Sequence, residues 1–382
     1  MNKLGIILKI AERCNLNCTY CYFFNGPDDS YKQRPARIKN ETIERLVEFL
    51  LEGIQELELN ALDIAFHGGE PLLYGIKEFD ALCNILITNL SSKIKLRLTI
   101  QTNGLLINEA WIALFKKHSV DVGISIDGPK EYNDKHRVDF FGRGSYDRLL
   151  KKIELLHKSS MRFGVLTVVN PDIGGEKIYS FITNELKVKS FDLLLPHLTH
   201  NEVSTHSMDQ YAKCLTDLFE IWTKADDPTI KIRFFNSFLR IFLGGERLIY
   251  GIGAPNKLSL PLITIRGDGE LGPATGLMYT DPNTVTNTGA NITDISLKDF
   301  LNYPIFLELA KAQTEMPPKC SSCCWEKVCG GGNIIDRFSK ENRFNNPSTY
   351  CDALQTLYAH ITKYLLVSGI SIDKLNDRLT IY

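Results

Sequence analysis

Three cysteines near the start of the chain have the type and spacing for metal chemistry. Cys14, Cys18 and Cys21 form a Cys-x3-Cys-x2-Cys triplet directly after a short apolar run. Three thiolates can hold a 4Fe–4S cluster and leave one iron open to a small chelating molecule. A zinc site is the alternative, but no fourth Cys or His follows within the loop at zinc spacing. The triplet therefore favours an open iron–sulfur cluster.

A second group of cysteines lies close to the C-terminus. Cys320, Cys323, Cys329 and Cys351 supply four thiolates on a segment rich in loop residues. Such a set suits either a tetrahedral zinc site or a second iron–sulfur cluster, and the residues alone leave both open. The remaining cysteines are expected to be core thiols or bystanders: Cys83, Cys214 and Cys324.

The elements that must position the triplet alternate between strand and helix over the first two hundred residues. Repeated βα units predict a parallel sheet or barrel. The predicted strands are Gly5–Ala11, Leu62–His67, Ile94–Thr102, Asp121–Ile126, Phe163–Asn170 and Phe191–Leu195. The predicted helices are Glu41–Leu57, Phe79–Leu90, Glu109–His118 and Tyr146–Ser159. Six strands indicate an α/β fold with a partial (β/α)6 TIM-like barrel, and the triplet would lie at its C-terminal mouth.

Changes in composition and in predicted elements along the chain indicate three regions. Residues 1–205 would form the partial barrel, and residues 206–255 a helical bridge. Residues 256–382 would form a domain around the second cysteine group, with a short strand at Leu262–Ile265 and a last helix at Asp352–Val367. Segments rich in Gly, Thr, Asn and Pro, Gly244–Gly253 and Gly267–Gly289, mark the change.

Composition restricts the partners and the compartment. The formal net charge is -1 and the 44 Lys and Arg residues are spread along the chain, so a basic stripe for nucleic acid is not expected. The sequence shows neither an apolar stretch of the ~20 residues that a membrane helix needs nor the pattern of a signal peptide. We therefore expect a cytoplasmic protein without nucleic-acid or membrane partners, whose thiols serve as metal ligands and core residues.

The triplet, with Tyr20 before its third cysteine, resembles the signature of the radical S-adenosylmethionine (SAM) superfamily. The resemblance implies that SAM binds the open iron through its amino and carboxylate groups. Reduction of the cluster would then cleave SAM to methionine and a 5′-deoxyadenosyl radical.

Further motifs follow the triplet in the order that the family shows. Gly68, Gly69 and Glu70, followed by Pro71, resemble the Gly-Gly-Glu-Pro motif, where only glycine lets the main chain approach the SAM amino group closely. In similar peptide-modifying enzymes, residues at the places of Ser125 and Arg137 contact the SAM ribose or carboxylate. The resemblance implies this set of SAM-binding residues: Tyr20, Gly68, Gly69, Glu70, Asn103, Ser125, Arg137 and Leu195.

The second cysteine group resembles the SPASM module of radical SAM peptide maturases, which carries two auxiliary clusters. Here Asn333 and Ala274 stand where the family has cysteines that serve the first auxiliary cluster. The resemblance therefore implies two 4Fe–4S clusters in total, one that cleaves SAM and one auxiliary cluster held by Cys320, Cys323, Cys329 and Cys351.

The run from Cys320 to Asn333 and the segment Leu297–Tyr303 resemble maturases of the Xye type. That resemblance implies a ribosomally synthesised precursor peptide as substrate, a carbon–carbon crosslink that closes a three-residue cyclophane, and a flavodoxin- or ferredoxin-like electron donor. Oxidation of a sulfatase Ser or Cys, or of a small molecule, is the alternative, and an electron carrier is disfavoured.

The position of the catalytic base separates these reactions. In sulfatase-maturing relatives an Asp acting as base follows the lost cysteine, whereas Thr275 stands here. Asp268 and Glu270 are the nearby acids that could substitute for it.

Overall fold

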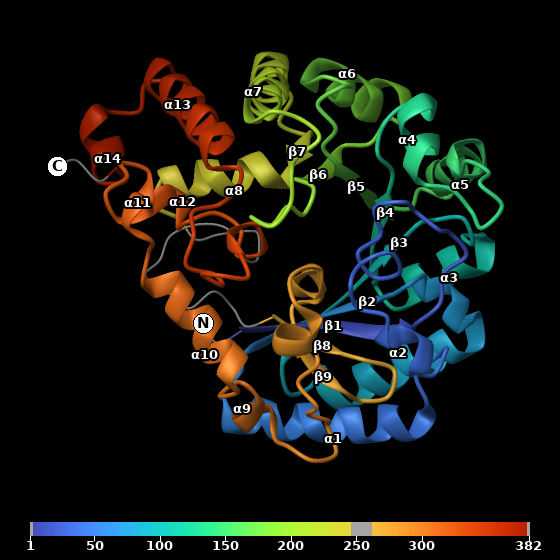
Figure 1. Ribbon diagram of the computed structural model, residues 1–382. Helices are drawn as coiled ribbons and strands as arrows, with labels where there is room; N and C mark the ends of the chain where they lie inside the picture. Colours follow the sequence, from blue (N-terminus) through green and yellow to red (C-terminus); the bar gives the residue numbers. More distant parts are fainter. Residues whose placement is uncertain (1–2, 246–261, 380–382) are drawn as a thin grey trace. The chain divides into compact units, whose positions relative to one another are not determined.

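The computed structural model describes residues 3–245 and 262–379, and its contacts group into two compact units (Figure 1). The first unit comprises residues 1–164 and 260–307, and the second comprises residues 165–259 and 308–382. The predicted boundaries at residues 205 and 255 stay predictions. Within the described ranges, none of the helices combines the length and apolar character that a membrane crossing requires.

The first unit is built on a mainly parallel sheet. Its strands are ordered β4-β3-β2-β1-β8-β9, with the bounds β1 Lys3–Ala11, β2 Ala61–Gly68, β3 Lys95–Thr102, β4 Asp121–Ser125, β8 Leu262–Ile265 and β9 Leu271–Pro273. Only β9 runs antiparallel, against β8. Because the strands are parallel, the chain segments that follow β1 to β4 all leave the same edge of the sheet, where the candidate ligands lie.

Helices cross between these strands, as βα units require. Their bounds are α1 Asn40–Glu56, α2 Ile76–Leu90, α3 Glu109–Lys117, α4 Lys130–His136 and α5 Tyr146–Lys158. Aromatic rings join the helices to the sheet, because the Phe79 ring lies 4.9 Å from the Phe66 ring and 5.3 Å from the Trp111 ring. This packed core makes the C-terminal strand ends a rigid platform.

Strand β8 departs from the predicted organisation. The sequence analysis assigned Leu262–Ile265 to a C-terminal domain, but in the structure β8 pairs in parallel with β1, with Gly5 opposite Leu262. Two short helical turns, η4 Thr275–Tyr279 and η5 Pro282–Thr286, follow β9, and helix α9 (Leu297–Phe300) packs against α1. The segment that carries the candidate bases therefore belongs to the first unit.

The second unit contains a short parallel sheet ordered β5-β6-β7 and most of the remaining helices. The strands are β5 Phe163–Val168, which begins in the last residues of the first unit, β6 Ser190–Leu194 and β7 Lys231–Ile232. The helices are α6 Gly175–Ser180 with the π-helical turn η3 Phe181–Glu185, α7 Met208–Ala225, α8 Arg233–Phe242, α11 Pro318–Ser321, α12 Glu326–Cys329, the 3-10 turn η6 Ile335–Arg337, α13 Cys351–Val367 and α14 Ile372–Asn376. Helix α10 (Pro304–Thr314) spans the boundary between the units.

Aromatic contacts hold the last long helix of the second unit in place. Helix α13 packs on α7, where the rings of Tyr364 and Phe219 lie 5.4 Å apart. Tyr358 of α13 meets Phe238 of α8 at 5.1 Å and Trp325 at 5.8 Å. These rings bury large apolar areas and fix the start of α13, where Cys351 lies.

The predicted α/β class and open, partial barrel are confirmed. All six predicted strands of residues 1–205 form, with ends that differ by at most two residues. The predicted helix Asp352–Val367 starts one residue earlier, at Cys351. The described part of the predicted helical bridge, residues 206–255, contains α7 and α8 with the short strand β7 between them. Most of the predicted Gly244–Gly253 loop lies outside the described residues.

Candidate active site

The three N-terminal cysteines lie on the loop that leaves β1. All are half-buried free thiols, and backbone hydrogen bonds fold the loop, from Cys21 N to Cys18 O at 3.0 Å and from Asn25 N to Cys21 O at 2.7 Å. Burial raises the pKa of Cys14 to about 12 and also raises the pKa of Cys18. Thiols in such surroundings ionise when the positive charge of a metal compensates the thiolate, so the loop suits an iron–sulfur cluster.

The two glycines after β2 pack against this loop. A Cβ atom at Gly68 would lie 1.9 Å from Ala11 O, and one at Gly69 would lie 2.4 Å from Arg13 O. The Gly69 and Glu70 amides instead donate to Ala11 O and Arg13 O, each at 2.8 Å. The glycines thus let the end of β2 approach the chain that leads into the triplet. The Gly69 and Glu70 amides already donate to backbone carbonyls of that chain.

Glu70 holds two strand ends together. Its carboxylate is fully buried and accepts hydrogen bonds from Leu72 N at 3.0 Å, Thr102 Oγ1 at 2.6 Å and Asn103 N at 2.8 Å. Burial raises its pKa, while these donors act against that rise. Glu70 is therefore well placed to fix the position of Asn103.

Asn103 in turn reaches the cysteine loop. Its Nδ2 donates to Asn15 Oδ1 at 2.7 Å and lies 3.8 Å from Cys14 Sγ. Its Oδ1 accepts from Leu105 N at 3.1 Å. The structure thus brings the predicted residue Asn103 next to a predicted cluster ligand.

A buried polar group borders Cys18. The Tyr20 hydroxyl donates to Asp127 and accepts from Arg137 Nη1 at 2.9 Å, while Arg137 Nη1 and Asp127 lie 4.0 Å apart. Arg137 is 8% exposed, and its buried Nε has no hydrogen-bond partner among the described residues. A buried guanidinium N–H without an acceptor fits an anionic group such as the SAM carboxylate.

The other two predicted SAM contacts differ in position. Ser125 ends β4, and its hydroxyl accepts from Gln101 Nε2 at 2.8 Å. Leu195 follows β6 in the second unit. The roles of both residues in SAM binding stay predictions.

The candidate bases lie on the segment around β9. Thr275 is buried, its hydroxyl lies 3.4 Å from Met278 Sδ, and it is hydrogen-bonded with the Tyr22 hydroxyl. Burial raises the pKa of Tyr22. Thr275 thus lies beside the residue that follows Cys21, but it carries no carboxylate there.

Both candidate acids are bound to one arginine. Arg34 Nη1 lies 2.7 Å from Asp268 Oδ2, and Arg34 Nη2 pairs with Glu270. The Arg34 side chain is only 8% exposed, whereas that of Asp268 is 36% exposed, and the two pairs tie the β8–β9 turn to Arg34.

The C-terminal cysteines line one hollow in the second unit. Cys320 lies on α11, Cys329 ends α12 and Cys351 starts α13, while Cys323 lies between the first two. Besides these four, the lining includes Trp325, Gln355 and Tyr358. Cys351 Sγ accepts from Gln355 Nε2 at 3.1 Å, and burial raises the pKa of Cys329 to about 12.

The arrangement of donors bears on the choice between zinc and a cluster. Zinc requires its ligands to converge on a point at ~2.3 Å from sulfur. In residues 3–245 and 262–379, no group of three or more His, Cys, Asp or Glu side chains converges on a single ion position. Four cysteines around one hollow are the donor set that a 4Fe–4S cluster takes.

Arg337 borders this hollow as well, although the sequence analysis did not single it out. It is 1% exposed, and its Nη2 lacks a hydrogen-bond partner among the described residues. Burial lowers its pKa, while the charges of Cys320 and Cys329 act against that effect. A buried guanidinium beside thiolates would offset the negative charge of a bound cluster.

Comparison with known proteins decides the family. The sequence profile of the Radical SAM superfamily matches residues 8–182, which include the triplet and its bordering motifs. An uncharacterized protein of Methanocaldococcus jannaschii, MJ0907, is 32% identical over 283 residues that cover 69% of this chain and 93% of that protein. The chain is a member of the radical SAM superfamily.

Other relatives narrow the type of this radical SAM enzyme. The cysteine-type anaerobic sulfatase-maturating enzyme of Clostridium novyi (strain NT) is 28% identical over 378 residues, which cover 94% of this chain and 95% of that enzyme. The structure of native anSMEcpe with bound AdoMet matches with a TM-score of 0.81 at 23% identity, covering 97% of this chain and 100% of that one. Over nearly its whole length the chain is thus similar to radical SAM maturases of the anaerobic sulfatase-maturating type.

Family membership confirms the cofactors. This radical SAM enzyme uses SAM and a 4Fe–4S cluster that cleaves it, and an auxiliary cluster is consistent with its similarity to the sulfatase-maturating enzymes. The assignment of individual residues to these cofactors remains a prediction that rests on the geometry given above.

Sequence reasoning missed a buried charged cluster beneath the cysteine loop. Lys9 Nζ lies 3.2 Å from His67 Nδ1 and 4.2 Å from the centre of the Phe23 ring. Burial lowers the pKa of Lys9 to about 7, and Glu12 accepts a hydrogen bond from Gly267 N at 3.1 Å. The signal was available, because Lys9 and Glu12 interrupt the otherwise apolar first strand and its exit.

Proposed function

We propose that this enzyme abstracts a hydrogen from a side-chain carbon of a ribosomally synthesised precursor peptide and closes a carbon–carbon crosslink, a three-residue cyclophane. The observation that carries the proposal is Thr275, a buried hydroxyl bound to Tyr22 at the place where sulfatase-maturing relatives have an acid. When bound, SAM and the reduced cluster supply the 5′-deoxyadenosyl radical for hydrogen abstraction.

The two candidate reactions need different proton acceptors. Oxidation of a Ser or Cys side chain to an aldehyde must remove the proton of an O–H or S–H group, and a positioned base contributes ~10²–10⁴-fold to such a step. Thr275 cannot act as that base near neutral pH, and Asp268 and Glu270 are engaged by Arg34. Ring closure instead joins a carbon radical to an aromatic carbon, and the adduct then loses an electron and an acidic ring proton, for which a weak acceptor suffices.

The atoms and electrons balance for this reaction. One substrate hydrogen leaves as an atom to 5′-deoxyadenosine, and the ring hydrogen leaves as a proton. The remaining electron needs an acceptor, and we assign that role to the auxiliary cluster. Cys320, Cys323, Cys329 and Cys351 would hold it, and the buried Arg337 would favour its reduced state.

The same proposal includes the partners and the compartment. The substrate is the precursor peptide, and a flavodoxin- or ferredoxin-like protein supplies the electron that starts each turnover. A cytoplasmic location fits the thiols, because a reducing compartment keeps them available to metal. One relative, anSMEcpe, has been solved with bound AdoMet and the Cp18Cys peptide.

Oxidation of a sulfatase Ser or Cys is the second candidate. It is favoured by the similarity to the Clostridium novyi cysteine-type enzyme along nearly the whole of both chains. It requires a base other than Thr275.

The deciding experiment compares products. The reconstituted enzyme would be given the peptide encoded by a short reading frame beside its gene and, separately, a sulfatase-derived cysteine peptide. A cyclophane product is lighter by two hydrogens, resists fragmentation inside the three-residue ring and lacks one aromatic proton by NMR. An intact aromatic ring with a new carbonyl, or turnover of the sulfatase peptide alone, would contradict the proposal.

Variants at position 275 sharpen the result. T275V should form the crosslink at a rate within about threefold of the wild type, because the hydroxyl is not the base. If Thr275 were the essential proton acceptor, T275V should lose ~10²–10⁴-fold in turnover. T275D places an acid beside Tyr22, so it is the matched variant that should gain aldehyde formation on the sulfatase peptide.

A further inference from the structure

A hairpin next to the cysteine loop presents two aromatic rings to solvent. Val138 and Gly144 form an antiparallel bridge, and the tip between them carries Phe140 and Phe141. These side chains are 64% and 83% exposed. Adjacent exposed phenylalanines are unusual on a protein surface and mark a site of interaction.

The hairpin is held in one conformation by a single buried acid. Asp139 is 5% exposed and accepts from the backbone N–H groups of Phe141 and Arg143, each at 3.0 Å. It also accepts from Arg143 Nε at 2.9 Å and Arg148 Nη2 at 3.4 Å. The rings are therefore presented by a preorganised turn, which lowers the entropy cost of binding a partner.

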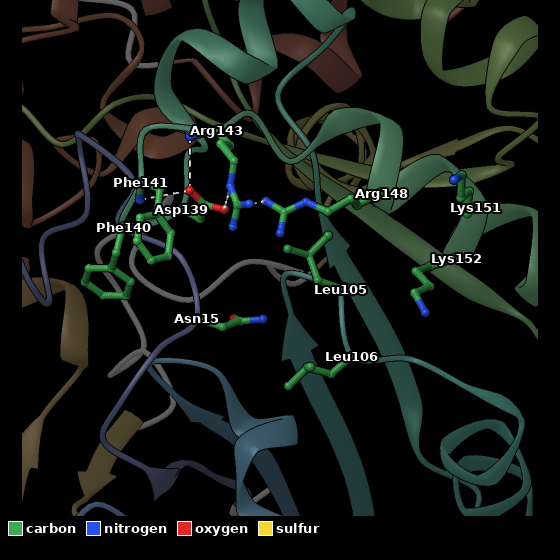
Figure 2. A pocket seen from close by; sticks show the side chains of 10 residues that line it. All are labelled: Asn15, Leu105, Leu106, Asp139, Phe140, Phe141, Arg143, Arg148, Lys151 and Lys152. Carbon is green, nitrogen blue, oxygen red and sulfur yellow. Dashed lines mark hydrogen bonds and ion pairs between the residues drawn. The ribbon is translucent and has the colours of Figure 1, made fainter.

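The surroundings of the rings are basic. Figure 2 shows a hollow beside them that is lined mainly by charged side chains. Four of these are basic, Arg143, Arg148, Lys151 and Lys152, and one is acidic, Asp139. Leu105, Leu106 and Asn15 complete the wall. Because Asp139 compensates only one of these charges, the surface carries an excess of positive charge. It therefore fits an acidic partner with an apolar centre.

This surface is joined directly to the cysteine loop. Asn15 lines the hollow and is the neighbour of Cys14 in the chain. Asn17 N donates to Val138 O at 2.7 Å, so the base of the hairpin and the loop share a backbone hydrogen bond. A partner on this surface would approach the candidate SAM-cleaving cluster from the side of Cys14.

We propose that this surface, defined by Phe140, Phe141, Lys151 and Lys152, docks an acidic one-electron carrier of the flavodoxin type. The proposal rests on the assignment of the cluster to Cys14, Cys18 and Cys21. Docking would serve one-electron transfer: the reduced carrier is oxidised by one electron and the cluster is reduced by one. No bond is made or broken and no proton is transferred in this step. The short connection through Asn15 is what favours an electron carrier over the precursor peptide or a second copy of this chain.

The test uses the reconstituted full-length enzyme with a purified bacterial flavodoxin as probe. Two variants remove separate parts of the surface, F140S/F141S and K151E/K152E. The matched control, K298E/K363E, reverses two exposed lysines elsewhere on the molecule. Calorimetric titration gives the flavodoxin affinity, stopped-flow gives the rate at which flavodoxin hydroquinone is oxidised, and dithionite-driven 5′-deoxyadenosine formation reports cleavage that needs no docking.

Both surface variants should bind flavodoxin about tenfold more weakly or worse and accept its electron at a correspondingly lower rate. Their dithionite-driven SAM cleavage should stay within about twofold of the wild type, as should every property of the control. The wild-type affinity should fall with added salt, and K151E/K152E should show a smaller slope because it lacks two of the charges.

Three results would overturn the proposal. Unchanged flavodoxin affinity in both variants would show that flavodoxin does not dock on this surface. Weaker binding of the precursor peptide, with flavodoxin binding intact, would assign the surface to the peptide. Loss of dithionite-driven cleavage would show that the hairpin serves the cluster loop itself. A failure of the crosslinking proposal would leave these measurements unaffected, because none of them depends on the peptide product.

Discussion

The two cysteine sites of this enzyme differ in what surrounds their thiols. The N-terminal site takes three thiols from one loop and is bordered by polar groups that follow β2, β3 and α4: Glu70, Asn103 and Arg137. The C-terminal site takes four thiols from α11, α12, the residues between them and the start of α13, and its lining mixes aromatic rings, Trp325 and Tyr358, with polar side chains such as Gln355. The first arrangement leaves space and hydrogen-bonding groups for a ligand, while the second only has to enclose a cluster.

This contrast teaches which parts of the fold each site needs. An open cluster must present one iron together with groups that hold a substrate, so it depends on the register of a parallel sheet. A closed cluster needs only its thiolates at the right separation, and it contributes folding free energy to a loop-rich segment.

The largest effect is expected from removing the N-terminal thiols. The triple variant C14A/C18A/C21A should form no 5′-deoxyadenosine and should lose about half of roughly eight bound irons, because each 4Fe–4S cluster needs its own thiolates. Iron analysis and chromatography of the nucleoside measure both. The control C83A/C214A alters two buried core thiols and should keep all of its iron. A wild-type content near twelve irons would show a third cluster.

The C-terminal thiols should separate initiation from turnover. C320A/C323A should keep about half of the iron and cleave SAM slowly, but it should not release crosslinked peptide if the auxiliary cluster accepts the substrate electron. Unfolding monitored by circular dichroism shows whether the second unit persists. Full peptide modification by this variant would show that the auxiliary cluster is not the electron acceptor. Zinc in the C-terminal site of the purified protein would contradict its assignment to an iron–sulfur cluster.

A smaller effect should follow from neutralising Glu70. In E70Q an amide group replaces one of the oxygens that accept from Leu72, Thr102 and Asn103, so one buried donor loses its partner. Such a loss costs about 1–3 kcal/mol of unfolding free energy. The displaced Asn103 should also weaken SAM binding, measurable by calorimetry. The exposed Glu78 supplies the control, and E78Q should change stability by less than about 0.5 kcal/mol.

An effect that appears only on acidification concerns the scaffold of the second unit. Burial lowers the pKa of His197 to about 4, so the folded state holds the ring neutral where the unfolded chain binds a proton. Stability from this group is present above its unfolded pKa of 6.5 and is lost as pH falls toward 4, by about 2–3 kcal/mol.

The variant H197Q isolates that contribution. The pKa of Asp336 is raised by burial, which makes stability fall with rising pH and acts in the opposite direction. Asp336 is present in both proteins, so its contribution cancels when the unfolding free energy of H197Q is subtracted from that of the wild type at each pH. That difference should shrink as pH falls from 6.5 to 4, and a constant difference would show that His197 does not titrate as expected.

Most of the scaffold could be predicted from the sequence, because periodicity and strand-ending motifs are local signals. The strands and the cysteine spacing follow directly from such patterns. The pairing of β8 with β1 could not be predicted, because the sequence of a four-residue apolar strand does not indicate which strand it will pair with. The contacts that β8 makes with β1 therefore come from the structure and not from the sequence pattern.

The motifs predict which residues belong to the site, but they do not give the contacts that these residues make. Glu70 was expected at SAM, yet its carboxylate joins β2 to β3, and the Gly69 amide bonds to Ala11 O. Buried polar groups such as Lys9 and Arg337 were missed, because their importance comes from side chains distant in sequence. Spacing predicts which residues share a strand end, but only packing decides which atoms remain available to a ligand.

The most direct test of the distinction between an open and a closed site is to find which cluster binds SAM. Electron–nuclear double resonance of the reduced enzyme with SAM labelled by nitrogen-15 at its amino group reports that contact. Coupling between the label and a cluster should appear in the wild type and in C320A/C323A and should be absent in C14A/C18A/C21A. Coupling that persists in the triple variant, or that vanishes only in C320A/C323A, would contradict the assignment of the open cluster to the N-terminal loop.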